Sequence, residues 1–454
     1  MTTVTADSMN RIVKLALDSG EAEDLEEAKN IFTRYRLQIH VGKGWADTLA
    51  GEAAFLTALN TANRAFLGGV WVSGDVSPLL RVPLFSGKTM IEAINELGGK
   101  YISEPRLDIP TIVIGRWDQH EAPIFCIRVC YNGWQAGCVP VWANDPFSMQ
   151  LDNPLAGVAA AALSINEAFL HVRGELLSAG DREVGMSLWR PDVIDNWSHP
   201  QYCGPELEYL PASLWLIGLG HLGQAYAWMI GMLPYPAAQR PYLVLQDIDT
   251  VAESNLSTCL FVSSAHIGQR KTRLVAARLE SIGIKTDIIE RRFTDTQRTL
   301  AGEPSTALFG VDNIAARRAI ESAGFGLVVE AGLGSGHRDF RNIRSHVFPG
   351  PLPSTEVWSA ADAVSPAVTL SPTYERMAEQ SNDRCGIIQL ATRAVATPFV
   401  GALASTLVIS DVIRLLHGGS VYAAIDIQMK DLRFRTIAQS VEKKCLLPAF
   451  IKVR

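Results

Sequence analysis

Three glycines in the second half of the chain have the spacing of a nucleotide-binding turn. Gly218, Gly220 and Gly223 follow the apolar segment 214–217 and precede an apolar helical segment. In such a turn the first glycine permits the bend, the second lets the backbone approach a ligand, and the third lets helix and strand pack closely. The free N–H groups at the start of the helix would face an anionic group. A turn that serves only packing has the same glycines.

Polar side chains follow the turn at wide intervals. Asp247 ends the segment 242–246, where a carboxylate can accept hydrogen bonds from ribose hydroxyls, although an ordinary strand-end acid would look the same. Asn255, Lys271 and Asp312 come later. A plain dinucleotide fold has no use for these three residues. Alone, Lys271 could be a solvated lysine at a helix start and Asp312 an N-cap of the following helix.

The polar residues form one longer motif when their neighbours are included. It reads Asp247-x-Asp249-x-Val251-x-x-Ser254-Asn255-Leu256, then Gly268-Gln269-x-Lys271, then Asp312-Asn313-x-x-x-Arg317. Over residues 205–430 this combination resembles the ThiF/MoeB/ubiquitin-activating enzyme superfamily. Members of that superfamily use ATP and magnesium to adenylate the C-terminal glycine of a ubiquitin-like protein.

The resemblance implies a role for each residue of the motif. Asp247 would bind the ribose, Asn255 and Lys271 the phosphates, and Asp312 a Mg²⁺ ion near the scissile phosphate. The chemistry agrees, because a carboxylate that attacks the α-phosphate brings negative charge to an anionic group, and a lysine and a metal ion offset that charge. We therefore expect ATP and Mg²⁺ as cofactors and catalytic roles for Lys271 and Asp312.

The motif departs from the family at one position. An arginine is usual three residues after the motif asparagine, and this chain has Thr258 there. Arg270 or Arg273 could replace it. In dimeric relatives a partner subunit supplies an arginine from near its N-terminus, and here Arg34 or Arg36 would be the candidate unless both lie on a solvated helical face.

Several superfamily members carry a cysteine before the last long helix, and it takes over the activated acyl group. Cys385 has the similar place, in a polar segment expected to be a loop, where the adjacent Arg384 would favour a thiolate. An incidental loop cysteine is the alternative. Cys259 is the rival nucleophile, although its flanks suggest burial. Other cysteines have apolar, strand-like neighbours and are expected in the core: Cys126, Cys130 and Cys138.

The elements that must position these residues alternate from about residue 205 onward, which favours a mostly parallel sheet covered on both faces. The expected strands are 214–217, 242–246, 286–290, 306–311 and 326–330. The expected helices are 221–233, 268–283, 295–302, 313–324 and 396–417. The fold class is therefore α/β, with a Rossmann-like ThiF-type adenylation domain at 205–454.

The first 200 residues are expected to hold an N-terminal helical segment, to about residue 38, and a degenerate α/β pseudo-adenylation domain. Asn153-Pro154 precedes an Ala-rich helix much as Thr397-Pro398 does, which suggests a duplication and a pseudo-dimer within one chain. Two unrelated core helices would give the same pattern. Further homo-oligomerisation stays open.

Bulk composition limits the class of protein. The 454 residues are 48% hydrophobic and 19% charged, as in a folded protein with more than one domain. The net charge of −6 argues against a nucleic-acid partner. Seven cysteines without a Cys-x-x-Cys pair predict reduced thiols in the cytoplasm and no structural zinc. We expect no signal peptide and no membrane span, and a buried helix at 394–409.

These observations favour an ATP-dependent activating enzyme that passes a ubiquitin-like protein through a cysteine thioester to a conjugating enzyme. The layout also resembles activating components of bacterial ubiquitin-like conjugation operons of the BilD kind, which implies antiphage defence. Alternatives are a ThiF-like adenylyltransferase that acts on a peptide or another acceptor without a thioester, an NAD-dependent oxidoreductase, and a scaffold with a vestigial site.

Overall fold

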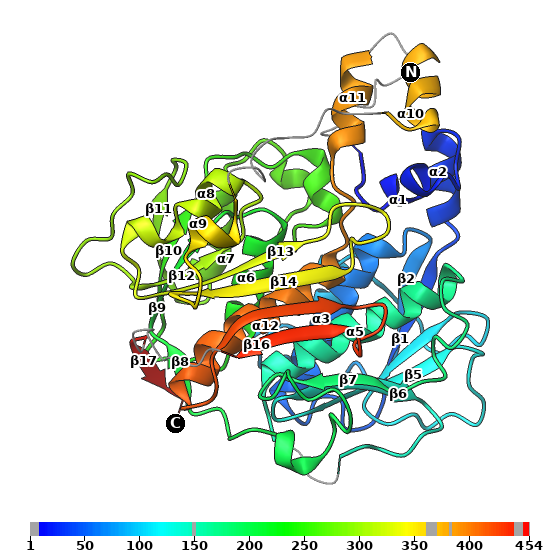
Figure 1. Ribbon diagram of the computed structural model, residues 1–454. Helices are drawn as coiled ribbons and strands as arrows, with labels where there is room; N and C mark the ends of the chain where they lie inside the picture. Colours follow the sequence, from blue (N-terminus) through cyan, green and yellow to red (C-terminus); the bar gives the residue numbers. More distant parts are fainter. Residues whose placement is uncertain (1–8, 148–150, 360–369, 381–383, 440–447, 454) are drawn as a thin grey trace.

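The computed structural model describes residues 9–147, 151–359, 370–380, 384–439 and 448–453. Within these ranges, only the backbone is described at residues 380, 384–386 and 389. Two sheets face each other across a layer of helices, and α10 (Pro372–Gln380) and α11 (Arg384–Thr392) project from one end (Figure 1). We call residues 9–205 the first half and residues 206–453 the second half.

The first half contains a seven-stranded sheet in the order β3-β2-β1-β4-β5-β6-β7. Its strands are β1 (Arg36–Val41), β2 (Gly69–Gly74), β3 (Lys100–Tyr101), β4 (Thr111–Ile114), β5 (Cys126–Asn132), β6 (Gln135–Pro140) and β7 (Val184–Ser187). Its helices are α1 (Lys14–Ser19), α2 (Leu25–Phe32), α3 (Leu49–Ala65), α4 (Met90–Glu96) and α5 (Pro154–Val172), with 3-10 helices η1 (Pro83–Phe85) and η2 (Pro200–Tyr202).

The second half contains an eight-stranded sheet in the order β11-β10-β9-β12-β13-β14-β15-β16, and a short pair of β8 with β17. The strands are β8 (Tyr209–Pro211), β9 (Ser213–Ile217), β10 (Tyr242–Gln246), β11 (Lys285–Ile289), β12 (Thr306–Phe309), β13 (Leu327–Leu333), β14 (Asn342–Phe348), β15 (Tyr422–Gln428), β16 (Arg435–Gln439) and β17 (Phe450–Lys452). The remaining helices are α6 (His221–Met232), α7 (Lys271–Glu280), α8 (Ile314–Arg318), α9 (Ser354–Val357) and α12 (Pro398–Leu416), with 3-10 helices η3 (Glu253–Ser257), η4 (Ser264–His266) and η5 (Ile320–Ala323).

The two sheets share one strand order. Strands β3-β2-β1-β4-β5 are parallel, as are β11-β10-β9-β12-β13, and in both sheets the next strands run antiparallel. Helix α5 lies between β6 and β7 in sequence, and α12 lies between β14 and β15. The mixed, mostly parallel α/β class expected from the sequence is thereby confirmed.

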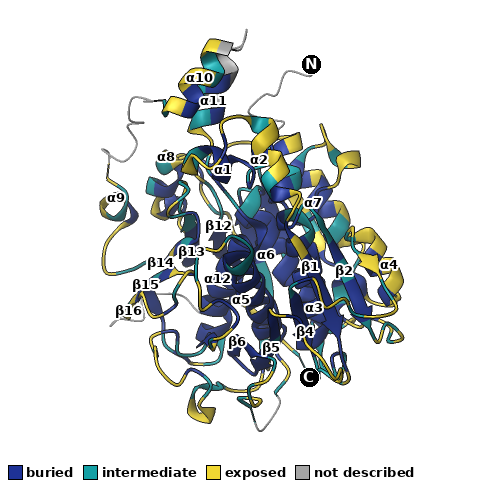
Figure 2. Ribbon diagram, turned by 90° about the vertical axis from the view of Figure 1, so that its right-hand side faces the viewer, coloured by how far each residue is buried: buried dark blue, intermediate teal, exposed yellow. Residues whose placement is uncertain are grey.

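Four helices form the layer between the sheets. Helices α3 and α5 pack on the first sheet, α6 and α12 on the second, and α12 also packs on α3 and α5. Figure 2 shows this layer as the most deeply buried part of the molecule. Small residues permit the close packing, because a Cβ added at Gly157 of α5 would lie 2.0 Å from the carbonyl oxygen of Ala50 in α3. A second apolar cluster covers the outer face of the second sheet around Trp215 and Phe309.

Helices α5 and α12 are long and apolar enough, by length and composition, to cross a membrane. In the structure 89% of the most apolar stretch of α5 and 94% of that of α12 are buried inside the protein, so both serve as core helices. The expectation of a buried helix near 394–409 is confirmed. Each begins with a proline after an extended N-cap residue, Asn153 or Thr397, as the missing N–H of proline allows.

Some expected elements differ in the structure. Residues 295–302 form turns and irregular structure rather than a helix, since this polar stretch has little apolar surface to bury and Thr299 bonds the carbonyl oxygen of Ala323. The helix expected at 313–324 is divided into α8 and η5. At the N-terminus the helical segment ends earlier than expected, because β1 begins at Arg36.

Candidate nucleotide-binding site

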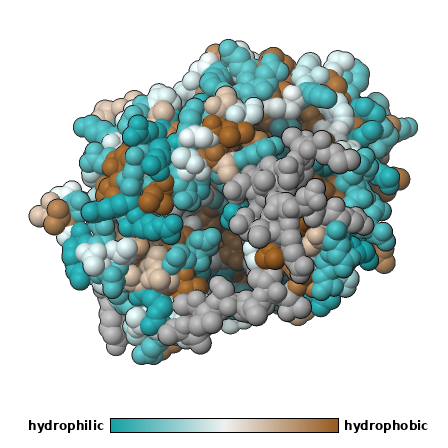
Figure 3. All heavy atoms as spheres, turned by 90° about the horizontal axis from the view of Figure 1, so that it is seen from above, coloured by the Kyte–Doolittle hydropathy of each residue, from teal (hydrophilic) through white to brown (hydrophobic). Residues whose placement is uncertain are grey.

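A cavity of about 1440 Å³ opens at the carboxyl ends of β9, β10 and β12. In α/β folds this edge of the sheet is the usual place for a ligand. Seen from above, this end of the molecule is largely hydrophilic, and its surface is hollowed near the middle (Figure 3). Most of the residues singled out in the sequence line the cavity: Gly218, Gly220, Asp247, Asn255, Lys271 and Asp312.

The glycine turn connects β9 to α6. Gly218 has φ +82°, and a Cβ there would lie 2.7 Å from Val311 Cγ1, so both backbone conformation and space require glycine. At Gly220 an added Cβ would meet open space, which leaves that backbone accessible from the cavity. Gly223 lies against the start of the turn, because its Cβ would come within 1.8 Å of the Gly218 carbonyl oxygen. Gly223 does not itself line the cavity.

Asp247 directly follows β10 and is bonded to the glycine turn. Its Oδ2 accepts the backbone N–H of Leu219 at 2.5 Å, and its Oδ1 accepts the backbone N–H of Asp249 at 2.7 Å. The carboxylate is thus fixed in orientation while remaining at the cavity wall. Each oxygen has a second lone pair that can accept a bond from a ligand hydroxyl.

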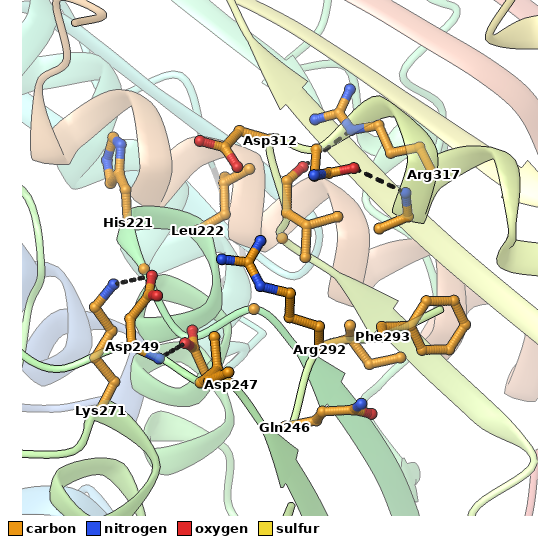
Figure 4. A pocket seen from close by; sticks show the side chains of 18 of the residues that line it. His221, Leu222, Gln246, Asp247, Asp249, Lys271, Arg292, Phe293, Asp312 and Arg317 are labelled. Carbon is orange, nitrogen blue, oxygen red and sulfur yellow. Dashed lines mark hydrogen bonds and ion pairs between the residues drawn. The ribbon is translucent and has the colours of Figure 1, made fainter. Parts of the chain in front are cut away.

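Lys271 begins α7 and is largely buried, with 9% of its side chain exposed. Its Nζ pairs with Asp249 Oδ2 at 3.0 Å, and the pair is visible at the edge of the cavity in Figure 4. Burial alone would lower the pKa of Lys271, but the carboxylates of Asp247 and Asp249 outweigh that effect and raise it. The ammonium is therefore charged and held in place beside the cavity.

Asn255 lies in η3 between β10 and α7. Its side-chain Oδ1 accepts the backbone N–H of Ala252 at 2.8 Å, and this hydrogen bond fixes the orientation of the side-chain amide. Thr258 follows in the same segment, is buried at 4% exposure and also lines the cavity. The position at which the resemblance described above implies an arginine thus holds a short side chain that cannot reach across the cavity.

Asp312 follows β12 and is exposed to the cavity. The cap of α8 is Asn313, whose Oδ1 accepts the Ala316 N–H at 3.1 Å, so Asp312 is not the N-cap that the sequence allowed. Arg317 fixes the backbone just before it, because its Nε donates to the carbonyl of Val311 at 2.9 Å. The carboxylate of Asp312 is left facing the cavity (Figure 4).

Arg11 and Arg292 are among the cavity arginines that the sequence did not reveal. Arg11 precedes α1, and its backbone N–H donates to Ser257 Oγ at 3.2 Å. The side chain of Arg292 points into the cavity between Asp247 and Asp312 in Figure 4 and has no ion-pair partner among the described residues. Its position three residues after strand 285–289 could have identified it, since polar residues at strand ends gather at one edge.

The arginines suggested by the sequence lie elsewhere. Arg34 and Arg36 are exposed residues outside the cavity lining, so the N-terminal arginine at the cavity is Arg11. Arg270 bonds the carbonyl of Ile248, and Arg273 pairs with Glu290 at 2.9 Å. Neither arginine lines the cavity, so neither replaces the arginine that is absent at Thr258.

His221 is a further cavity residue that the sequence did not reveal. It is the first residue of α6, and its Nε2 is buried without a hydrogen-bond partner in the described part of the chain. Burial, together with the charge of Arg11, lowers the pKa of His221 to about 4. The imidazole is therefore neutral at physiological pH. A Cβ at Gly401 of α12 would lie 2.3 Å from that nitrogen, so the histidine packs directly on α12.

Cys385 lies in the first turn of α11 rather than in the loop expected from the sequence, and its side chain is outside the described part of the structure. Cys259 is completely buried, and burial raises its pKa, which makes it a poor nucleophile. Three cysteines lie in the core as predicted: Cys126, Cys130 and Cys138.

Positive and negative groups thus converge on one cavity. The cations Arg11, Lys271 and Arg292 can offset the charge of a polyphosphate, and the free N–H groups at the start of α6 face the same space. Asp312 supplies a hard oxygen ligand of the type that Mg²⁺ prefers when phosphates complete its coordination. Among the described residues no group of three or more His, Cys, Asp and Glu side chains could hold a metal by itself.

Comparisons with known proteins place this geometry in a family. The BilD N-terminal domain matches residues 36–188, and the BilD C-terminal domain matches residues 210–419. The chain is 38% identical over 436 residues to the bacterial E1-like protein BilD of Collimonas sp. (strain OK412), which covers 95% of this chain and 94% of that protein.

Solved structures with some likeness include E. coli MccB, at 13% identity and a TM-score of 0.37, over 71% of this chain and 94% of that chain. Another is E. coli tRNA N6-threonylcarbamoyladenosine dehydratase, TcdA, in complex with ATP, at 17% identity and a TM-score of 0.21, over 24% and 44% of the two chains. The two BilD domain matches and the Collimonas relative, which extends over nearly the whole length, decide the assignment: the chain belongs to the BilD family of bacterial E1-like proteins.

Proposed function

We propose that this protein is an ATP-dependent activating enzyme that adenylates the C-terminal glycine of a ubiquitin-like protein. One observation carries the proposal. Asn255, Lys271 and Asp312 come from separate parts of the sequence and line the same cavity as the glycine turn and Asp247. An NAD-dependent oxidoreductase needs the glycine turn and Asp247 but has no use for the other three residues. Membership in an E1-like family supports the same chemistry.

The side chains divide the binding of ATP among them. Asp247 accepts hydrogen bonds from the ribose hydroxyls, as its position after β10 and its fixed orientation favour. The N–H groups at the start of α6, Asn255 and Lys271 bind the phosphates. Arg292 and Arg11 supply the cations that Thr258 does not, since both reach the cavity from other elements.

Asp312 is the residue that would hold Mg²⁺. Its carboxylate faces the cavity, and one protein carboxylate together with phosphate oxygens is a usual environment for this ion. When bound, Mg²⁺ neutralises phosphate charge and orients the pyrophosphate leaving group. Arg317 contributes by holding the Val311 carbonyl, and with it the backbone that aims Asp312.

The reaction is a nucleotidyl transfer. An oxygen of the substrate's C-terminal carboxylate attacks the α-phosphorus, the bond to the β-phosphate bridging oxygen breaks, and pyrophosphate leaves with that electron pair. Lys271 and the cavity arginines stabilise the charge that accumulates on the α-phosphate oxygens. The product is an acyl adenylate, whose carbonyl carbon is open to a second nucleophile.

Cys385 is proposed as that nucleophile. Its thiolate would attack the carbonyl carbon and release AMP, which gives a thioester that a conjugating enzyme can accept. A reduced thiol of this kind suits the cytoplasm. A role in antiphage defence, within a conjugation operon, belongs to the same proposal.

The first half is proposed to be a degenerate copy of the second, so that one chain forms a pseudo-dimer. The common strand order and the equivalent places of α5 and α12 support this relationship. After β1 the first half has a buried Trp45, whose indole N–H donates to the carbonyl of Asp75 at 2.9 Å. An aromatic side chain thus bridges the ends of β1 and β2, where the second half has its accessible turn.

The test is ATP–pyrophosphate exchange with the purified chain and a small ubiquitin-like protein encoded beside it. We expect exchange with the intact small protein and none when its C-terminal glycine is deleted. Lys271→Met should reduce exchange by at least about 100-fold, as removal of a charge-stabilising donor does. The exposed Lys285 on β11 provides the matched control, Lys285→Met, with wild-type exchange. Exchange that ignores the terminal glycine would contradict the proposal.

A further inference from the structure

The segment 253–262, which carries Asn255 and Thr258, is held by a side chain from the first half of the chain. Arg64 lies in the last turn of α3 and reaches across to this segment. Its Nη1 donates to the carbonyl of Leu256 at 2.5 Å, and its Nη2 donates to the carbonyls of Leu260 at 3.3 Å and Val262 at 3.0 Å. One guanidinium therefore satisfies three backbone carbonyls on both sides of Thr258.

A neighbour on the same helix completes the arrangement. Asn60 Oδ1 accepts a bond from Arg64 Nε at 3.0 Å, and Asn60 Nδ2 donates to the Leu260 carbonyl at 3.0 Å. The planar guanidinium has donors in a fixed fork, so the direction of each carbonyl is specified as well as its distance. A lysine at position 64 could not bond all three carbonyls, because its ammonium is a single point of charge.

The environment of Arg64 is unusual for a cation. Its hydrogen bonds go to carbonyl oxygens and an amide oxygen, and no carboxylate pairs with it among the described residues. Burial lowers the pKa of Arg64 to about 10, which still leaves it charged at neutral pH. A half-buried cation without a carboxylate needs other compensating partners. Here the segment must keep its three carbonyls turned inward to provide them.

We infer that Arg64 is a positioning residue for ATP binding, which fixes the backbone of 253–262 so that Asn255 is presented to the phosphates. The carbonyl it holds most closely belongs to Leu256, the residue directly after Asn255. This inference rests on the proposed function. It assigns a role to the first half, which is to hold the segment 253–262 of the second half in the conformation that the nucleotide site needs.

Other contacts join the halves without touching this segment. Trp228 Nε1 donates to Thr57 Oγ1 at 3.0 Å, and Arg278 pairs with Glu96 at 2.5 Å. The attachment of the halves therefore does not depend on Arg64 alone. Its distinctive contribution is the conformation of 253–262, and that conformation can be measured separately from stability.

The test measures ATP affinity by isothermal titration calorimetry on the full chain. Arg64→Met keeps the length of the side chain but removes every donor, and Arg64→Lys keeps the charge but not the fork. We expect the Kd for ATP to rise by about tenfold or more in both variants, and KM for ATP to rise with it while kcat changes much less. Arg128→Met is the control, since Arg128 is a first-half arginine that donates to one carbonyl, that of Ala143, away from the cavity.

Hydrogen exchange by mass spectrometry gives a readout that does not require activity. Peptides covering 253–262 should exchange faster in both Arg64 variants than in the wild type, while peptides covering α12 stay protected. If a folded Arg64→Lys protein has unchanged ATP affinity and unchanged hydrogen exchange in 253–262, the inference is overturned and the proposed function stays intact. ATP binding with the expected Arg64 effect, but no pyrophosphate exchange, would overturn the proposed function alone. A wild type that binds no ATP would overturn both.

Discussion

The carboxylate of Asp247 accepts the backbone N–H of Leu219 at 2.5 Å, inside the glycine turn itself. Leu219 and Asp247 are separated in sequence by α6, the loop after it and β10, yet they form one hydrogen-bonded unit. A ligand bound at this unit would meet the free N–H groups of α6 and a carboxylate of fixed orientation together. The following predictions concern the side chains around that unit.

Asp312→Asn should separate binding from chemistry. The substitution keeps the shape of the side chain but removes the charge that a Mg²⁺ ligand needs. We expect pyrophosphate exchange to fall by more than about 100-fold, with the unfolding midpoint unchanged because Asp312 is exposed and caps no helix. Exchange close to the wild-type rate at ordinary magnesium concentration would show that another residue holds the metal.

Arg11→Ala should weaken the use of ATP although Arg11 lies far from the motif in sequence. The residue lines the cavity, so its loss removes a cation near the phosphates. We expect kcat/KM for ATP to fall by about 10- to 100-fold in exchange assays. Arg34→Ala provides the comparison, because Arg34 is exposed and outside the cavity. Equal effects of the two substitutions would mean that Arg11 acts only through net charge.

Cys385→Ser should interrupt the reaction after adenylation. Exchange of pyrophosphate should remain, because the acyl adenylate forms before the thiol is needed. The thiol-sensitive adduct with the ubiquitin-like protein, seen on non-reducing gels of the wild type, should be replaced by a stable ester or be absent. Formation of the final product at the normal rate in this variant would favour transfer to an acceptor without a thioester.

Stability should fall in weak acid because of His221. Its folded pKa of about 4 lies below its ordinary value of 6.5, so the unfolded chain binds the proton more readily. The contribution of His221 to the free energy of unfolding is therefore complete above about pH 6.5 and is lost as the pH falls towards 4. Its total is up to about 3 kcal/mol. Urea unfolding at pH 7.5 and 5 measures it. His221→Gln should flatten this part of the pH dependence, and an unchanged slope would contradict the assignment.

Much of the second half could be predicted from the sequence because its signals are local. Apolar segments followed by Gly218 or Asp247 mark strand ends, and the strand expected at 242–246 has those bounds in the structure. The polar segment 295–302 was predicted wrongly as a helix, since a stretch with little apolar surface takes its conformation from tertiary contacts such as that of Thr299 with Ala323.

The candidate site was predictable in its motif residues but not in its long-range partners. Arg11 and Arg64 reach the nucleotide cavity or its supporting segment from the first half, and no spacing rule connects them with Asn255. Arg292 was accessible to reasoning, because it follows a predicted strand on the edge where the motif residues gather. The helical position of Cys385 was missed because its polar flanks suggested a loop.

The absence of a side chain at Gly157 lets α5 rest on the backbone of α3, and α12 lies on both of these helices. The two sheets are thus joined through their most apolar surfaces and not by the peptide connection alone. A protease cut in the exposed stretch at residues 194–196 would accordingly leave two fragments that stay together and co-migrate, whereas either fragment synthesised alone would expose the apolar face of its own helices and aggregate.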